Sequence, residues 1–423
     1  MSRHQRFHGG HHDRQGSKQG LRAERRRARR MLLNQTTEPS GCSKAMRVSH
    51  VCPFLDEQMG GTERYVANII KVQSKHYDVH VYTTTCKLQK VGTTEWNGAT
   101  VHRFYSPMVL WNINPIAFIF RSLIESNPDI LHVHSHLYTT SNQAALMKKI
   151  KRSKVLLQLH GGVGPPPFRT SWTRLAAKQF YDASLGKFTI KNSDIVASVS
   201  KSDLDYVARQ LSIPEHRLRY LPNAVDTDVF KPRVRKESSC DKTLLYVGDL
   251  EPWKGVGLLM KWIRQWKSAD GDGVRIRFVG QGSYLPELRK MQEDHHKGTN
   301  GMSVEVLGPK HHSEIPGIMN EAAALVFTSY WEGMPTVILE AMSSGVPVIS
   351  TPVGAVPDVI SNMETGLLID RSLESFQEAV TFILNDVSAT QRIRQNARAA
   401  VEQRFSLAKA GRALQEVYSD MCS

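Results

Sequence analysis

The 423-residue chain has no long apolar run and little cysteine. A membrane-spanning helix needs about 18 uninterrupted apolar residues, and the best candidate, residues 108–120, is broken by Asn112, Asn114 and Pro115. We therefore expect no bilayer span. The five cysteines are scattered without Cys-x-x-Cys spacing, so neither a disulfide framework nor a zinc site is indicated, and a reducing cytoplasm is expected.

More than half of the excess positive charge lies in the first 45 residues. They hold nine arginines and two lysines against three acidic residues, which is +8 of the chain's +15. No apolar segment of ~7 to 15 residues follows the arginines, so a secretory signal is not indicated. The segment has no hydrophobic period and is expected to have no fold of its own. It is either a solvated tail or an electrostatic contact for anionic lipid or RNA, and the remaining +7 no longer favours a nucleic-acid partner.

From Met46 onward, short apolar runs alternate with segments of helical period, which is typical of mostly parallel sheets covered by helices. The polar stretch 231–242 interrupts this alternation and is the best linker candidate. Strands are expected at 46–51, 79–83, 130–134, 155–160, 195–200 and 218–221 before it, and at 243–247, 274–279, 303–307, 324–328, 346–350 and 366–370 after it. The pattern predicts an α/β protein with two doubly wound domains facing across a cleft, where ligands bind beyond the carboxyl ends of the strands.

The most informative segment runs from Ser329 to Ser350, SYWEGMPTVILEAMSSGVPVIS. An apolar strand leads into a polar loop, Pro335 suits a first helical position, and a short helix is expected to end at Gly345. Amides of the first turn, around Met334 to Val337, would bind a phosphate or a polar sugar. Glu332, in the loop, would accept hydrogen bonds from sugar hydroxyls, and Glu340 would accept two hydrogen bonds from a ribose diol. Without further context, two glutamates eight residues apart more often cap a helix and face solvent.

That segment resembles the two-glutamate signature of retaining nucleotide-sugar glycosyltransferases of family 4, which have two Rossmann-like domains in the arrangement called GT-B. Other landmarks of that family follow in order and extend the resemblance from Met46 to nearly the whole remaining chain. They are Gly60-Gly61, DILHVHSH (129–136), LLQLHGG (156–162), SDIVASVSKSD (193–203), LPNAVDTDVF (221–230), YVGDLEPWKGVGLL (246–259), FVGQGSYLPEL (278–288) and TPVGAVPDVI (351–360).

Composition sets apart the basic arm at 1–45 and the linker at 231–242. The resemblance implies an acceptor-side Rossmann-like domain at 46–230 and a nucleotide-sugar-binding Rossmann-like domain at 243–400, and we expect a C-terminal helix at 401–423 that packs back on the first domain. It implies catalytic roles for His160, Glu332 and Lys254. Donor-binding positions on the same basis are Gly60, Gly61, Gly280, Gly282, Gly333, Met334, Pro335, Thr336, Val337 and Glu340. The LGPKHH loop (307–312) would lie near the base.

One position departs from the family pattern. The first strand of the second domain is commonly followed by Gly-Arg, and that arginine helps a later lysine to hold the donor diphosphate. Here the lysine is present as Lys254, but Asp249 occupies the arginine's position. A carboxylate would repel phosphate. Either Lys254 and backbone amides supply the stabilisation, or Asp249 faces another partner.

The implied reaction retains the configuration of the anomeric carbon, needs no cofactor, and uses a nucleotide sugar such as a UDP- or GDP-hexose as substrate. We expect no metal dependence, on the premise that the chain lacks an Asp-x-Asp carboxylate pair to hold an ion. His134 and His136 have the spacing of two ligands on one face of a strand, but no cluster visibly completes a metal shell, and we interpret them as cleft or sheet-edge residues.

The resemblance implies a hydroxyl acceptor and leaves open whether it belongs to a glycan, a lipid-linked molecule or a small molecule. A stretch between His160 and Asp194 mixes apolar with basic residues: Trp172, Leu175, Phe180, Leu185 and Phe188 with Arg169, Arg174, Lys178 and Lys187. As an amphipathic helix it would lie on the anionic inner face of a membrane. Alternatively, its apolar residues are core anchors.

Three other functions remain open on the sequence. One is a catalytically silent nucleotide-sugar binder, which Asp249 favours. Another is a sugar phosphorylase or epimerase of similar architecture, although no pyridoxal-phosphate lysine environment is recognisable. The third is a protein whose function lies in RNA or membrane binding by the arm.

Overall fold

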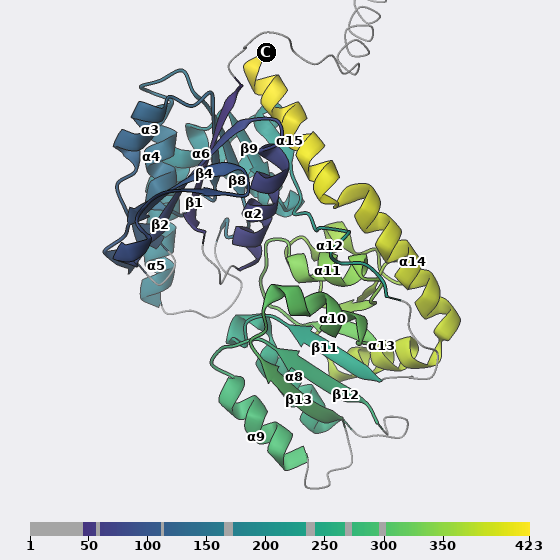
Figure 1. The fold of residues 1–423 in the computed structure, drawn as a ribbon. Helices are drawn as coiled ribbons and strands as arrows, with labels where there is room; N and C mark the ends of the chain where they lie inside the picture. The colour runs from purple at the N-terminus through teal and green to yellow at the C-terminus, as the bar shows by residue number, and fades with distance from the viewer. Residues whose placement is uncertain are drawn as a thin grey trace, which may run out of the picture. The chain divides into compact units, whose positions relative to one another are not determined.

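The structure is a computed structural model that describes residues 45–55, 60–110, 114–164, 172–233, 242–266, 273–295 and 302–423 (Figure 1). Nearly all of the arm expected at 1–45 and most of the linker expected at 231–242 lie outside these residues, so both remain predictions. Within the described part of the chain, no helix is both long and apolar enough to cross a membrane.

Residues 46–233 build an eight-stranded sheet in the order β10-β9-β8-β7-β1-β2-β4-β3. All neighbouring strands are parallel except β3 and β4. The strands are β1 (Arg47–Phe54), β2 (Asp78–Thr85), β3 (Gly92–Trp96), β4 (Ala99–Tyr105), β7 (Ile130–His134), β8 (Lys154–Leu159), β9 (Ile195–Ser198) and β10 (Leu218–Tyr220). A separate two-stranded ribbon pairs β5 (Met108–Leu110) with β6 (Asn114–Ile116).

Six helices connect these strands: α2 (Gly61–Gln73), α3 (Phe120–Ser126), α4 (Thr139–Met147), α5 (Trp172–Tyr181), α6 (Lys187–Lys191) and α7 (Lys201–Leu211). In α2, the spacing of apolar residues buries Tyr65, Val66, Ile69 and Ile70 on one face, as the helical period of the sequence predicts. β7 is buried along its whole length, as expected for a parallel strand covered on both faces.

Residues 242–385 build a six-stranded parallel sheet in the order β13-β12-β11-β14-β15-β16. Counted in chain order, this is the 3-2-1-4-5-6 arrangement of dinucleotide-binding folds. The strands are β11 (Thr243–Val247), β12 (Arg275–Val279), β13 (Ser303–Gly308), β14 (Ala324–Phe327), β15 (Val348–Ser350) and β16 (Leu367–Leu368), and the helices are α8 (Val256–Gln265), α9 (Leu285–His295), α10 (Ile315–Asn320), α11 (Thr336–Ser343), α12 (Val356–Val359) and α13 (Leu373–Asn385).

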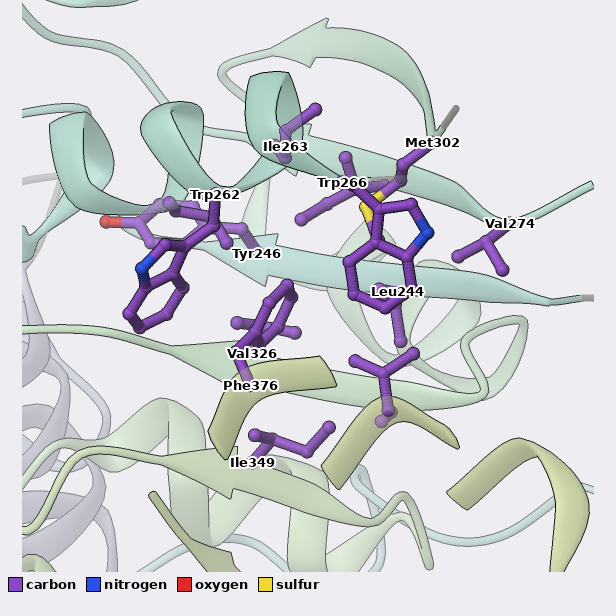
Figure 2. Close-up of a cluster of buried hydrophobic side chains, with 14 of the residues drawn as sticks. Leu244, Tyr246, Trp262, Ile263, Trp266, Val274, Met302, Val326, Ile349 and Phe376 are labelled. Atoms are coloured by element: carbon purple, nitrogen blue, oxygen red, sulfur yellow. The ribbon is translucent and has the colours of Figure 1, made fainter. Parts of the chain in front are cut away.

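The core of the second sheet contains large aromatic side chains from two helices (Figure 2). Trp262 of α8 stacks on Phe376 of α13 with ring centroids 5.0 Å apart, and Trp266 meets the same ring edge-on at 5.7 Å. Aromatic pairs of this kind contribute about 0.5–1.5 kcal/mol beyond their area burial. They fix two helices that are more than a hundred residues apart in the chain against one sheet.

The C-terminal helices belong to both halves of the molecule. α14 (Val387–Arg404) buries Ala397 and Val401 in the core of the second sheet. α15 (Leu407–Cys422) packs on α2, and its Leu414, Val417 and Tyr418 join the core of the first sheet (Figure 1). The chain therefore returns to the first domain for its last helix.

The predicted fold class, an α/β protein with two doubly wound parallel sheets, is confirmed. All twelve predicted strands are present, with ends displaced by a few residues at most. Among the described residues, four strands were missed, β3 to β6. For two of them a signal existed: Asn97-Gly98 between β3 and β4 has positive φ at both residues (50° and 78°), the hairpin turn that Asn-Gly favours.

Candidate active site

The order of the second sheet places two of the predicted catalytic residues at one point. β11 and β14 are neighbours in the sheet. After β11 the chain continues to β12 on one side, and after β14 it continues to β15 on the other side. Ligands of open α/β sheets bind at such a point, where the strand order reverses. Lys254 ends a short 3₁₀ turn (Pro252–Lys254) after β11, and Glu332 lies in the loop after β14. Residues 78 positions apart are therefore brought together by strand pairing.

Lys254 and Glu332 form a close ion pair. Nζ of Lys254 donates to Oε1 of Glu332 at 2.7 Å, and the hydroxyl of Ser329 donates to the same oxygen at 2.8 Å. Both charged side chains are largely buried, at 21% and 12% exposed. The lysine keeps further donors and the glutamate keeps its second oxygen, so the pair can bind a ligand that carries both phosphate and hydroxyl groups.

His160 reaches this pair through contact between two loops. A Cβ on Gly333 would lie 2.2 Å from the carbonyl oxygen of His160, and a Cβ on Gly161 would lie 2.8 Å from Cα of Gly333. Gly161 also has φ of +100°, which side chains rarely adopt. Glycine is thus required on both loops for His160, at the end of β8, to lie beside Glu332.

The first turn of α11 faces the first domain. Gly61, which begins α2, lies so close to Thr336 that an added Cβ would be 3.1 Å from its Oγ1. Asn223 donates from Nδ2 to the carbonyl of Met334 at 2.7 Å. Pro335 was predicted as the first residue of this helix, but it is the N-cap of α11. The first backbone amides without a partner inside the helix are therefore those of Thr336 and Val337.

Other predicted donor-binding residues have structural partners of their own. Glu340 is 5% exposed and its Oε1 is 3.0 Å from Nε2 of His312, which brings the LGPKHH loop onto α11. Gly280 and Gly282 are needed for backbone contact, since a Cβ would lie 1.9 Å from the oxygen of Gly248 and 2.5 Å from that of Leu250, respectively. Their role as ligand-binding residues stays a prediction.

Asp249 is exposed after β11, and its backbone oxygen accepts from the Tyr246 hydroxyl at 3.0 Å. Across from it, Glu63 follows Gly60 in the first turn of α2. Burial is the main cause that raises the pKa of Glu63, and the charge of Asp249 adds to it. Two carboxyl groups therefore lie near each other where phosphate was expected, and a proton on Glu63 would reduce their repulsion.

The histidines expected at a cleft or sheet edge are buried. His134 is 0% exposed and lies between His160 and His50, while His136 is 1% exposed with Nε2 3.4 Å from Asp182. His50, His132 and His134 are close enough to hold a metal ion together. However, all six of their ring nitrogens already have hydrogen-bond partners at 2.6–3.0 Å, so the cluster is fully satisfied as it stands.

The premise given for metal independence was wrong, because the sequence contains three Asp-x-Asp pairs, at 203/205, 226/228 and 270/272. The third lies outside the described residues. Asp203 accepts from Ser198 at 3.3 Å, and Asp226 accepts from the amides of Asp228 and Val229. Asp203 and Asp226 thus accept hydrogen bonds from residues within five positions of themselves. Independence from metal remains a prediction without that support.

Sequence reasoning missed Glu63, Asn223 and Ser329. Glu63 carried a signal, an acid in the first turn of a helix after a glycine pair. Asn223 did not, because its partner Met334 is 111 residues away in the other domain. Ser329 is three residues from Glu332 in the same loop, but a serine at that spacing has no distinctive pattern.

The helix expected to be amphipathic, α5, leaves large apolar residues uncovered. Trp172 is 79% and Phe180 is 77% exposed, so these two are not core anchors. Lys178, expected on a solvated face, instead donates to Asp182 and to the carbonyl of Gly164. Arg169 lies outside the described residues.

Comparison with known proteins identifies the architecture. The profile of the glycosyl transferases group 1 matches residues 230–400, and that of Glycosyltransferase Family 4 matches residues 59–229. Among solved structures, Anabaena HepE in complex with UDP has a TM-score of 0.69 at 19% identity and covers 89% of this chain and 100% of that one. Sucrose-phosphate synthase from Thermosynechococcus elongatus has a TM-score of 0.71 at 17% identity, covering 89% and 99%.

Curated relatives are also glycosyltransferases. The Schizosaccharomyces pombe phosphatidylinositol N-acetylglucosaminyltransferase gpi3 subunit is 26% identical over 384 residues, 88% of this chain and 80% of the relative. A GDP-mannose-dependent phosphatidylinositol monomannoside mannosyltransferase of Mycobacterium tuberculosis is 29% identical over 248 residues, 55% and 61%. D-inositol 3-phosphate glycosyltransferase of Corynebacterium aurimucosum is 26% identical over 334 residues, 72% and 75%.

The two sheets and the loops between them therefore define a glycosyltransferase of the GT-B fold. More narrowly, the chain belongs to the family 4 type, with the group 1 domain as its second half.

The buried histidines predict a loss of stability in mild acid. Burial lowers the pKa of His50 and of His160 to about 4 and those of His132 and His134 well below 6.5. Below pH 6.5 the unfolded chain binds protons at these rings that the folded chain does not, so the free energy of unfolding should fall as pH falls. His50 alone would contribute about 1.4 kcal/mol per pH unit between 6.5 and 4.

Urea unfolding between pH 7.5 and 6.0 follows the onset of this fall, before the opposing contribution of Asp203, whose pKa burial raises to about 6, reaches its full size. A His76→Gln variant, which removes an exposed histidine, should keep the same slope. A free energy of unfolding that is constant or rises over this interval would contradict the prediction.

Proposed function

We propose that this protein is a retaining hexosyltransferase that moves a sugar from a nucleotide diphosphate donor to an acceptor hydroxyl. The observation that carries the proposal is the Lys254–Glu332 ion pair beside His160 and the first turn of α11. UDP and UDP-glucose are bound in the HepE structures, which supports a nucleotide-sugar donor here.

The proposed step is a substitution on one face of the sugar. The bond from the anomeric carbon to the diphosphate oxygen breaks, the acceptor oxygen bonds to the same carbon from the same side, and its proton passes to the departing phosphate oxygen. Lys254 and the amides of Thr336 and Val337 would stabilise the negative charge that develops on the diphosphate, while Glu332 and His160 orient the sugar. No protein nucleophile and no metal ion is needed in this scheme.

Glu332→Gln tests the assignment. It removes the charge that orients the sugar and holds Lys254, so kcat should fall by about 10²–10³, the usual cost of losing one such stabilising group. The thermal midpoint should change little, because the amide still accepts from Ser329. Nucleotide release is measured across UDP- and GDP-sugars, with and without acceptors and in the presence of EDTA.

The control for that experiment is Glu364→Gln, an exposed carboxylate outside the cleft. Near-normal turnover of Glu332→Gln would refute the catalytic assignment. Tight donor binding by the wild type without turnover on any acceptor would support a silent binder instead, and loss of turnover in EDTA would refute the metal-free scheme.

We propose that the acceptor carries a phosphate, in the form of an inositol phosphate headgroup. The curated relatives act on phosphatidylinositol, its mannoside or inositol 3-phosphate by their names. In this chain a cavity of about 160 Å³ at the ends of β1 and β2 is lined by Lys87, Lys90 and Arg103, and no acidic residue is among the described residues that line it. Three cations around a small cavity favour an anionic ligand.

Lys87→Gln should raise the KM for a phosphorylated inositol acceptor several-fold and leave the KM for the donor unchanged, because one charge on the phosphate loses its partner. Initial rates at varied acceptor and fixed donor give both constants. Lys75→Gln, at an exposed residue just after α2, is the matched control. Equal effects of the two variants would argue against this cavity.

We further propose that α5 contacts an anionic membrane. Trp172, Phe180 and the half-exposed Leu185 present apolar surface to solvent within a basic segment, as in helices that lie in the plane of a bilayer.

Trp172→Ser combined with Phe180→Ser should strongly reduce co-sedimentation with vesicles that contain anionic lipid, because both changes remove exposed apolar area. Val387→Ser, which removes an equally exposed apolar residue from α14, should have no effect. Binding of the double variant at the wild-type level would exclude α5 as the contact.

A further inference from the structure

A continuous chain of buried hydrogen bonds begins at His160 and enters the interior of the first domain. Nε2 of His160 is 3.0 Å from Nδ1 of His134, and Nε2 of His134 is 3.0 Å from Nδ1 of His50. Nε2 of His50 then lies 2.6 Å from Oε1 of Gln73, at the end of α2. His134, His50 and Gln73 are at most 1% exposed.

This series of hydrogen bonds continues through the last helix of the protein. Nε2 of Gln73 donates to the hydroxyl of Tyr418 in α15 at 2.9 Å. That hydroxyl is 2.8 Å from Nδ1 of His132, whose Nε2 is 3.0 Å from Oε1 of Gln158 in β8. Tyr418, His132 and Gln158 are 0% exposed, so water does not compete for these bonds.

At Gln158, the last residue of this series of hydrogen bonds, donor and acceptor can be assigned. Nε2 of Gln158 donates to the backbone carbonyl of Leu221 at 3.2 Å and to the Tyr65 hydroxyl at 3.1 Å. A carbonyl oxygen only accepts, so the amide must present its NH₂ to Leu221 and its oxygen to His132. His132 consequently carries its proton on Nε2.

Each neutral ring has one N–H and one lone pair, so this direction propagates along the chain. With Nε2 protonated, Nδ1 of His132 accepts from the Tyr418 hydroxyl. Tyr418 has then used its only proton and must accept from Gln73, which requires the NH₂ of Gln73 on that side and its oxygen toward His50.

The same rule, one N–H and one lone pair for each neutral ring, fixes the donors and acceptors from Gln73 back to His160. His50 donates from Nε2 to Gln73 and accepts at Nδ1 from His134, which in turn accepts at Nδ1 from His160. His160 is thereby an Nε2–H tautomer with a lone pair on Nδ1. Burial lowers the pKa values of all four histidines, which keeps the rings neutral as the rule requires.

The other side of His160 would favour the opposite tautomer. Its Nδ1 is buried and has no hydrogen-bond partner among the described residues, and the same holds for Oδ1 of Asn223. Asn223 is oriented by its bond to Met334 and acts to raise the pKa of His160. A proton on Nδ1 would satisfy that oxygen, so the tautomer that the chain imposes is held against a local alternative.

We propose that Gln73 and Tyr418 are positioning residues that fix the tautomer of His160, so that the active-site ring presents a hydrogen-bond acceptor, not a donor, at Nδ1. Through Tyr418, the last helix of the protein thereby controls which ring nitrogen of His160 carries the proton. The tautomer follows from the hydrogen-bond chain alone, whereas its effect on sugar transfer rests on the proposed function.

Gln73→Met is the sharpest test, because it removes the acceptor for Nε2–H of His50 and puts an apolar group of similar size in its place. The chain should then reverse, and the proton of His160 should move from Nε2 to Nδ1, where Asn223 accepts it. Tyr418→Phe breaks the chain at a second point and should have the same effect. Tyr77→Phe is the control, since Tyr77 packs edge-on against Tyr418, with centroids 5.7 Å apart, without joining the chain.

Nitrogen-15 NMR of histidine-labelled, donor-free protein at pH 7.5 reports which ring nitrogen carries the proton, and it does not depend on catalysis. The wild type and Tyr77→Phe should show Nε2–H at His160, and the other two variants should show Nδ1–H. A wild-type Nδ1–H tautomer, or Nε2–H retained in either chain-breaking variant that folds, overturns the proposal.

Kinetics separates this proposal from the proposed function. If both hold, the chain-breaking variants should lose about fivefold to tenfold in kcat, the equivalent of about one hydrogen bond, with the KM for the donor changed less than twofold. A tautomer that moves as expected in a protein without transferase activity would refute the proposed function and leave the positioning role intact.

Discussion

The close backbone contact between the loop after β8 and the loop after β14 is the constraint on which the rest of the site depends. His160-Gly161 and Glu332-Gly333 approach so closely that a Cβ on either glycine would collide with the other loop. This contact places the end of one sheet against the end of the other. The loop that carries Glu332 and the backbone of His160 meet because neither glycine has a Cβ at the point of contact.

Support for that contact comes from behind each loop. On one side, Ser329 and Lys254 hold Glu332. On the other, the ring of His160 is bonded to His134 and through it to a buried network that ends at Gln158 in β8, two residues before His160. A network of this kind is strong only when every member is satisfied, and here its inner members are. The C-terminal helix contributes Tyr418 to it, so packing of the last helix and geometry of the cleft are linked.

Some of this could be predicted from the sequence. Strands such as β7 and β11 were predicted to the residue because a run of apolar residues bounded by polar ones has few other interpretations. The glycine pairs, Glu332 and Lys254 were predicted as site residues by resemblance, and the structure places Glu332 and Lys254 in contact. Glu340 was placed correctly in a helix, but its partner His312 was not foreseen, since it is 28 residues earlier in a different connection.

The buried histidines show where sequence reasoning stops. From their spacing, His134 and His136 were interpreted as cleft or sheet-edge residues, whereas His134 is an interior ring bonded to two other histidines. Nothing in the order of residues shows that His50, His132, Gln73 and Tyr418 converge, because their bonds cross up to 345 positions of the chain. The two alternating α/β halves and the charged arm could be recognised in the sequence, because they follow from local periodicity and from composition. Which residues meet at the site, and which nitrogen of each buried ring carries the proton in the proposed network, required the tertiary structure, because both depend on contacts between strands and helices that are distant in the chain.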